Sequence, residues 1–120
     1  MRHRKSGRKL NRTAGHRKAL FRNQLQQLIE HERICTTEAK AKELRRFADK
    51  IITLAKRDDL HSRRLAFTLL RSKKATKKLF EVLAKRFETR TSGFTRLYKY
   101  KHRRGDGAPL SLIEFTKQEE

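Results

Sequence analysis

The sequence has little of the chemistry that marks secreted or membrane-spanning proteins. Of its 120 residues, one is cysteine, one is proline and none is tryptophan. The single cysteine, Cys35, cannot form an intramolecular disulfide, which favours a reducing compartment. No apolar run approaches the roughly 18–20 residues that span a bilayer, and the N-terminus lacks the apolar segment of a secretory signal. We therefore expect a protein of a reducing compartment with no membrane-spanning segment.

Patterns for catalysis and for metal or cofactor binding are also missing. The five histidines are scattered, and no two of them have the spacing of metal ligands. There is no phosphate-binding glycine loop, dinucleotide fingerprint or nucleophile elbow. Asp58 and Asp59 are neighbours whose side chains diverge, so helix capping explains them better than acid–base chemistry. We expect no enzymatic activity, catalytic residue, metal, cofactor or small-molecule substrate.

Positive charge is what the sequence has in excess. Lys and Arg number 33 against 13 Asp and Glu, a formal net charge of +20, and such a charge repels itself unless a polyanion neutralises it. No acid precedes Glu30, and nine Lys and Arg do. A basic N-terminal arm is expected over residues 1–12, with the binding side chains Arg2, His3, Arg4, Lys5, Arg8, Lys9 and Arg12. A solvated tail and an organellar transit peptide are the alternatives, and the lack of compensating acids favours nucleic-acid binding.

Apolar spacing predicts about four helices after the arm. Thr13 can cap the first, which is expected to end near His31, and Thr36 or Thr37 can cap the second. Asp58 or Asp59 is expected to cap the third helix, and Ser72 the fourth. The positions predicted to be buried, helix by helix, are Phe21, Leu25, Leu28 and Ile29; Leu44, Phe47, Ala48, Ile51, Leu54 and Ala55; Leu65, Ala66, Leu69 and Leu70; and Ala75, Leu79, Val82, Leu83 and Phe87.

Two further segments have the alternation of strands. Residues 34–37 are β-prone and short, and residues 94–101 alternate in a period of two. A Gly-rich turn at residues 104–107 then leads to a strand over residues 110–115, which predicts a β-hairpin. The expected fold is α+β, with the helices packed on a small sheet that the C-terminal hairpin forms with the short strand near residues 34–37. We expect a basic extension over residues 1–12, one compact domain over 13–116, and a frayed tail over 117–120.

Basic residues inside the predicted domain extend the candidate interface beyond the arm. The expected RNA-binding positions there are His16, Arg17, Lys18, Arg22, Lys73, Lys74, Lys99, Lys101, His102, Arg103 and Arg104. The lysines at the start of the fourth helix oppose its dipole, which suggests a bound anion, although a solubilising face explains them equally well. Tyr98 and Tyr100 could stack on unpaired bases. Because they share a strand face with Phe94, we expect both rings to belong to the core instead.

Four segments of the sequence form a recognisable set of motifs: MRHRKSGRKLNRTAGHRKALFRN (residues 1–23), IEHERICTTEAKAKELR (29–45), RFETRTSGFTRLYK (86–99) and RRGDGAPLSLIEF (103–115). They resemble one protein family, that of bacterial large-subunit ribosomal protein seventeen. The four segments occur in order, with little insertion, over nearly the whole chain. The resemblance implies an α+β structural protein without catalysis or cofactor. Its implied partners are large-subunit (23S) rRNA and neighbouring ribosomal proteins, and we do not expect it to form a homo-oligomer in the ribosome.

Two other classes of protein compete with this interpretation. In a DNA-binding module, the third and fourth helices would act as a helix-turn-helix, but the positive charge is spread over the arm, helices and hairpin. In a membrane-surface protein, an apolar helix face would lie on lipid, but the apolar stripes here are short and suited to internal packing.

Overall fold

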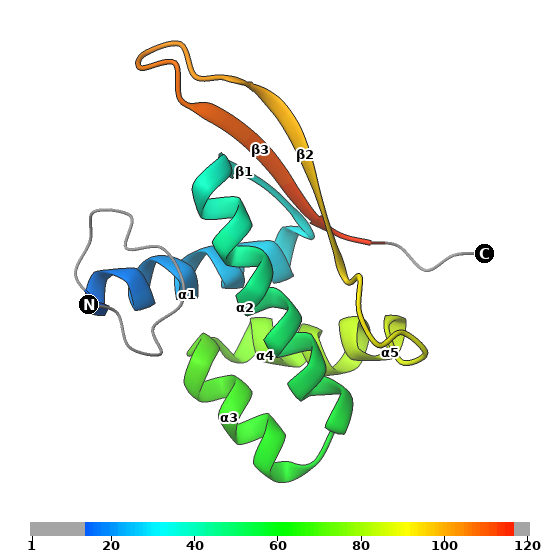
Figure 1. Cartoon of the computed structure of the whole chain (residues 1–120). Coiled ribbons are helices and arrows are strands. Elements are labelled where there is room, and N and C mark those ends of the chain that lie inside the picture. Colours follow the sequence, from blue (N-terminus) through cyan, green and yellow to red (C-terminus); the bar gives the residue numbers. More distant parts are fainter. Residues whose placement is uncertain (1–13, 117–120) are drawn as a thin grey trace, which may run out of the picture.

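The computed structural model describes residues 14–116, which form the α+β fold that the sequence predicts (Figure 1). The elements in chain order are α1 (Ala14–His31), β1 (Arg33–Thr37), α2 (Glu38–Arg57), α3 (Leu60–Leu70), α4 (Lys73–Lys78), η1 (Leu79–Leu83), α5 (Ala84–Arg86), β2 (Thr95–His102) and β3 (Pro109–Phe115). The last three helical elements follow one another without a break, with a π-helical turn in the middle, so they correspond to the predicted fourth helix. The predicted arm, the predicted cap at Thr13 and the predicted tail lie outside the described residues.

The sheet is antiparallel, with β3 in the centre and the strand order β1-β3-β2. Ile113 of β3 is opposite Ile34 on one side and Leu97 on the other, so the three residues form one cross-strand row. This confirms the predicted hairpin and the predicted short strand. The register between β2 and β3 shifts between Lys99 and Lys101, which is a β-bulge near the end of the hairpin.

α2 runs through the middle of the molecule and contacts α1, α3, η1 and the strands (Figure 1). Its predicted stripe is largely confirmed, and the predicted face of α1 is buried as well. Among the differences, Phe47 is 40% exposed, and Ala41 and Ile52, which were not predicted, are completely buried. Because α2 has neighbours on several sides, its buried face is wider on the side of Ile52, and Phe47 lies at its opposite margin.

The predicted faces of the third and fourth helices were partly wrong. Leu65, Leu69 and Val82 are 40%, 54% and 42% exposed. In α3 the buried stripe is Ser62, Ala66 and Leu70, with a strict four-residue spacing that leaves the other leucines outside. In η1 the wider π turn changes the phase of the helix, which exposes Val82 and buries Phe80. A sequence pattern that assumes a period of 3.6 residues cannot anticipate this change of phase.

Two of the predicted helix caps are confirmed, and one is in place without its hydrogen bond. An Asp59 carboxylate oxygen accepts from the backbone N–H of Ser62 at 2.7 Å, and the Ser72 hydroxyl accepts from that of Ala75 at 3.2 Å. Thr37 precedes α2, but its side chain makes no capping hydrogen bond. Thr37 is also the last residue of β1, so the end of the strand sets its backbone position.

Glu32 joins the helical part of the molecule to the sheet. It lies between α1 and β1 with a φ of 63°, in the left-handed region that few residues other than glycine adopt. Its carbonyl oxygen accepts from the backbone N–H of Phe115 at 3.0 Å. Its carboxylate binds the Arg86 guanidinium and lies 3.5 Å from Nζ of Lys78. The hydrogen bond from Arg86, opposed in part by desolvation, lowers the pKa of Glu32 below its ordinary value.

Glu32→Gln should therefore reduce stability in a pH-dependent way. The carboxylate has a lower pKa folded than unfolded, so its contribution is complete above the unfolded pKa and is lost as pH falls through the folded pKa. At neutral pH the loss should be about 1 kcal/mol, since the side chain is partly exposed and the pairs are screened. Urea unfolding of both proteins at neutral and acid pH would measure it. Glu88→Gln, at an exposed position, is the control, and a difference between wild type and Glu32→Gln that did not shrink in acid would contradict the assignment.

Candidate nucleic-acid interface

The predicted basic positions in the described region fall into two groups at different parts of the molecule. One group lies on α1 and at the start of α4, and it comprises His16, Arg17, Lys18, Arg22, Lys73 and Lys74. The other lies on β2 and the turn that follows, and it comprises Lys99, Lys101, His102, Arg103 and Arg104. Arg17 and Arg22 are half-buried and the other nine are exposed. Seven predicted positions, in residues 1–12, lie outside the described residues.

The helical group lies where α1 packs against α3 and α4. Lys73 and Lys74 are exposed in the first turn of α4, behind the Ser72 cap. Lys78, at the end of the same helix, is different because its Nζ donates to the Glu30 carbonyl at 2.9 Å and pairs with Glu32. The run of lysines therefore divides into an exposed part that can reach an anion and one residue that ties α4 to the end of α1.

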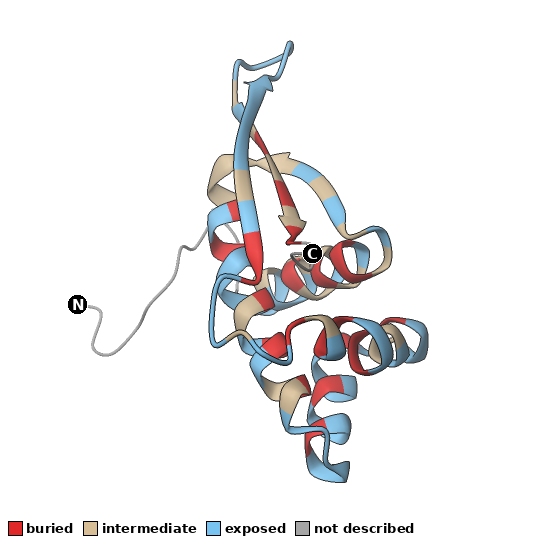
Figure 2. Cartoon of the chain, turned by 90° about the vertical axis from the view of Figure 1, so that its right-hand side faces the viewer, coloured by how far each residue is buried: buried red, intermediate tan, exposed pale blue. Residues whose placement is uncertain are grey.

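The hairpin carries its basic group away from the helices. In Figure 1 the ends of β2 and β3 and the turn between them project beyond α2, and Figure 2 shows the turn as exposed. Arg103 and Asp106 form an ion pair inside the turn, with Arg103 Nε 3.0 Å from Oδ1 of Asp106. The same oxygen accepts from the backbone N–H of Ala108 at 3.1 Å. Hydrogen bonds from Arg103 and Ala108 hold the pKa of Asp106 well below its usual range.

Arg103 is thus partly committed to the turn, whereas Arg104 and Lys101 are exposed beside it. Gly107 has a φ of 70°, and the backbone there needs the conformational freedom of glycine. The ion pair and the glycine therefore fix the conformation of the turn, and the basic side chains beside it are exposed to solvent.

Tyr98 and Tyr100 are not part of the core, contrary to the prediction. Their exposed fractions are 41% and 54%. Phe94, at the start of the same segment, is buried against Phe87 with ring centroids 5.2 Å apart. On β2, Leu97 packs against the core and is opposite the buried Ile113 of β3. Tyr98 is opposite Leu112, on the other face of the sheet, and Tyr100 lies at the register shift near the hairpin turn, so neither ring belongs to the buried row. Nζ of Lys101 lies 5.3 Å from the centroid of the Tyr100 ring, so an exposed aromatic and a cation are adjacent there.

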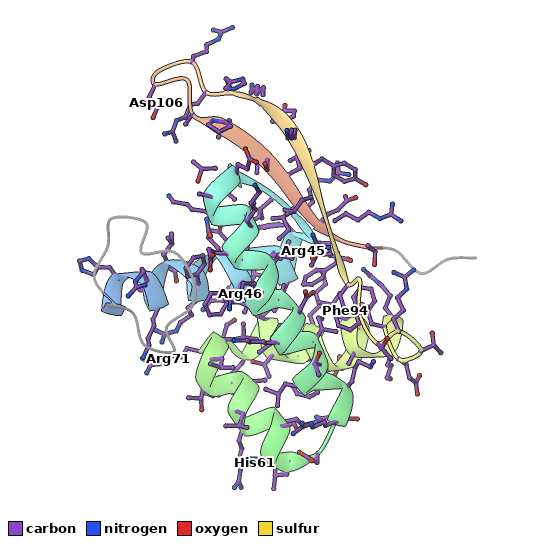
Figure 3. The ribbon with its side chains drawn as sticks, viewed as in Figure 1. Arg45, Arg46, His61, Arg71, Phe94 and Asp106 are labelled. Carbon is purple, nitrogen blue, oxygen red and sulfur yellow. The ribbon has the colours of Figure 1, made fainter. Side chains whose placement is uncertain are left out.

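Two cations near the helical group were missed in the sequence, Lys50 and Arg71. Both line a groove between α1, α2 and α3. Arg71 ends α3 with a φ of 52°, and Figure 3 shows it at the end of α3 that lies toward α1. Lys50 follows Phe47 by one helical turn, and that spacing beside an aromatic was the available signal.

Within residues 14–116, no three His, Cys, Asp or Glu side chains gather at one place. None of the helices there combines the length and the apolar character needed to cross a bilayer.

The fold and this surface define a small, strongly basic α+β protein suited to a polyanion. A comparison with known families identifies the family: residues 20–116 match the model of Ribosomal protein L17, and the chain belongs to that family.

Curated relatives are similar in sequence to this protein over nearly its whole chain. The large ribosomal subunit protein bL17 of Desulforapulum autotrophicum is 55% identical, with 99% of each chain covered. That of Lawsonia intracellularis is 56% identical, covering 98% of this chain and 94% of the relative. The bL17 of Desulfosudis oleivorans is 57% identical over 97% of this chain, which spans 56% of that longer protein.

Arg103→Ala should raise the pKa of Asp106 toward its ordinary value. Arg103 is the largest cause of the lowered pKa, and the Ala108 N–H that remains should keep it somewhat below normal. In wild type the stability that this pair contributes is complete above the unfolded pKa of Asp106 and is lost as pH falls through its depressed folded pKa. Carboxyl-carbon NMR over an acid titration measures both proteins. Arg104→Ala is the matched control, and an equal shift in that variant would contradict the pairing.

Proposed function

We propose that this protein is a structural component of the large ribosomal subunit in the bacterial cytoplasm, where it binds large-subunit (23S) rRNA and contacts neighbouring ribosomal proteins. Its membership of the Ribosomal protein L17 family supports the proposal. The observation that carries the binding mode is the exposed basic surface, with one group of cations on α1 and α4 and another on the hairpin. Lys and Arg on such a surface gain affinity by neutralising phosphates and releasing counterions. The role involves no catalysis and no cofactor.

The proposed interface consists of the arm, residues 1–12, and the two basic groups of the compact domain, which extends over residues 13–116 and is followed by a short tail. A net charge of +20 disfavours contact between copies of the chain, so we propose that it acts as a single copy on RNA. A helix-turn-helix mode on DNA is less well supported, since the basic positions are not concentrated on one recognition helix.

Sucrose-gradient sedimentation of a bacterial lysate tests the ribosomal role. With a tagged chain expressed from a plasmid, the protein should sediment with the large subunit at low salt. Nuclease treatment specific for DNA should leave this distribution unchanged. A protein that sediments free, or together with DNA, at low salt would contradict the proposal.

Removing residues 1–12 tests the arm separately. The segment holds six Lys and Arg, so the slope of log affinity for rRNA against log salt should flatten by up to about 4, at roughly 0.7 per neutralised phosphate. The helical circular dichroism should remain nearly intact, because Met1 and Leu10 are the arm's only large apolar residues. A chain with the same six residues changed to Gln is the matched control for length. Loss of the fold on deletion would show that the arm is structural.

A further inference from the structure

A groove between α1, α2 and α3 combines an apolar floor with a basic rim. It has a volume of about 420 Å³. Its floor is formed by Phe21, Leu25, Phe47, Ile51 and Leu69. Phe47 and Leu69 are 40% and 54% exposed, so a substantial apolar area faces the solvent at this place.

Phe47 has the geometry of a stacking platform. Its ring stacks on Phe21 with centroids 4.8 Å apart and planes 25° from parallel. Phe21 is 5% exposed and belongs to the core, so Phe47 rests on a support that does not move with the surface. An exposed aromatic ring held in this way can receive a second planar ring at little cost in side-chain entropy.

All three helices contribute cations to the rim. These are Lys18 and Arg22 from α1, Lys50 from α2 and Arg71 from the end of α3, and among the described residues no acid lines the groove. Nε of Arg22 is buried, with no hydrogen-bond partner within the described residues. Nζ of Lys50 lies 6.0 Å from the centroid of the Phe47 ring, so charge and ring are within reach of one ligand.

A second groove on the same molecule differs in its lining, because it contains an acid beside its cations. It surrounds Phe67, which is 42% exposed, and is lined by Arg63, Lys73 and Lys77 together with Glu81. A carboxylate in the lining repels phosphate, so that groove is less suited to nucleic acid. Phe47 and Phe67 therefore form a natural pair of test and control positions.

The observations favour one occupant. A second copy of the chain carries +20, and residues 1–13 carry six Lys and Arg and no acid, so like charge opposes both at this rim. The carboxylates of an acidic peptide would pair with the cations, but a peptide need not contain a planar group that stacks on the Phe47 ring. A base that is not paired in a helix has a flat face for the ring and phosphates on either side for the cations.

We propose that this groove binds one unpaired base of RNA, stacked on Phe47, with the flanking phosphates on Lys18, Arg22, Lys50 and Arg71. The site deepens the proposed function and rests on it. It adds local shape recognition to the sequence-independent attraction of the basic surface, because a continuous duplex presents no free base. The chain would thus prefer RNA with a bulge or a single-stranded loop.

Binding of the full-length chain to two labelled RNAs tests the site, one a hairpin with a single bulged nucleotide and the other its fully paired counterpart. Phe47→Leu keeps an apolar side chain but removes the ring, so affinity for the bulged RNA should fall roughly tenfold, while affinity for the duplex stays unchanged. Phe47→Tyr should retain wild-type binding, and Phe67→Leu is the matched control. On the wild-type complex, NMR should show contacts between the Phe47 ring protons and the bulged base, a readout that does not depend on the variant folding.

The outcomes separate this proposal from the ribosomal one. If wild type binds both RNAs and Phe47→Leu binds the bulged RNA equally well, or if the NMR contacts are absent, the base site is wrong and the ribosomal role stands. If an acidic, leucine-containing peptide competes with RNA and binds Phe47→Leu as tightly as wild type, the groove belongs to a protein partner. If wild type binds neither RNA and does not sediment with the large subunit, both proposals fail.

Discussion

The turn at Glu32 connects three regions that are far apart in the sequence. Its backbone redirects the chain from α1 into β1, its carbonyl accepts from the end of β3, and its carboxylate binds Arg86 of α5 and Lys78 of α4. The left-handed conformation is unfavourable for a side chain with a Cβ, and it persists where surrounding contacts over-determine it. Glu32 thus ties the helices to the sheet through polar contacts, in addition to the packing of α2 on the strands.

Several acids of this protein form ion pairs within turns, within helices or between neighbouring strands. The cations outnumber the acids, and the excess of positive charge lies on the surface. Glu114 binds Arg33 across β1 and β3, Asp106 binds Arg103 within the hairpin turn, and Glu38 pairs with Lys42 on α2. These pairs are local or join neighbouring elements, and exposed ones add little stability individually. With 13 acids against 33 cations, most basic side chains have no acid to meet. A bound polyanion compensates such a surface, and the family to which the chain belongs is in keeping with that role.

Much of the fold was predictable because local signals agreed with one another. The caps at Asp59 and Ser72, the short strand before α2 and the hairpin each have a mechanism in a few adjacent residues. The errors have two physical origins. The π turn in η1 changes the phase of that helix, and elsewhere burial depends on the neighbours of a face and not only on its pattern. Tyr98 continues the alternation of Phe94, yet it lies on the sheet face opposite to Leu97 and Ile113, which pack in the core.

The sequence by itself determined the charge, the candidate basic residues and the class of fold, since composition, periodicity and capping are properties of short segments. Tertiary structure decided that Lys78 and Arg86 are committed, because their partners Glu30 and Glu32 are about fifty residues away in the sequence and only the folded chain brings them near. It also placed Phe47 at the margin of the core, next to Arg71 and Lys50 in one groove. That juxtaposition joins three helices, and packing between helices is long-range information that no local pattern contains.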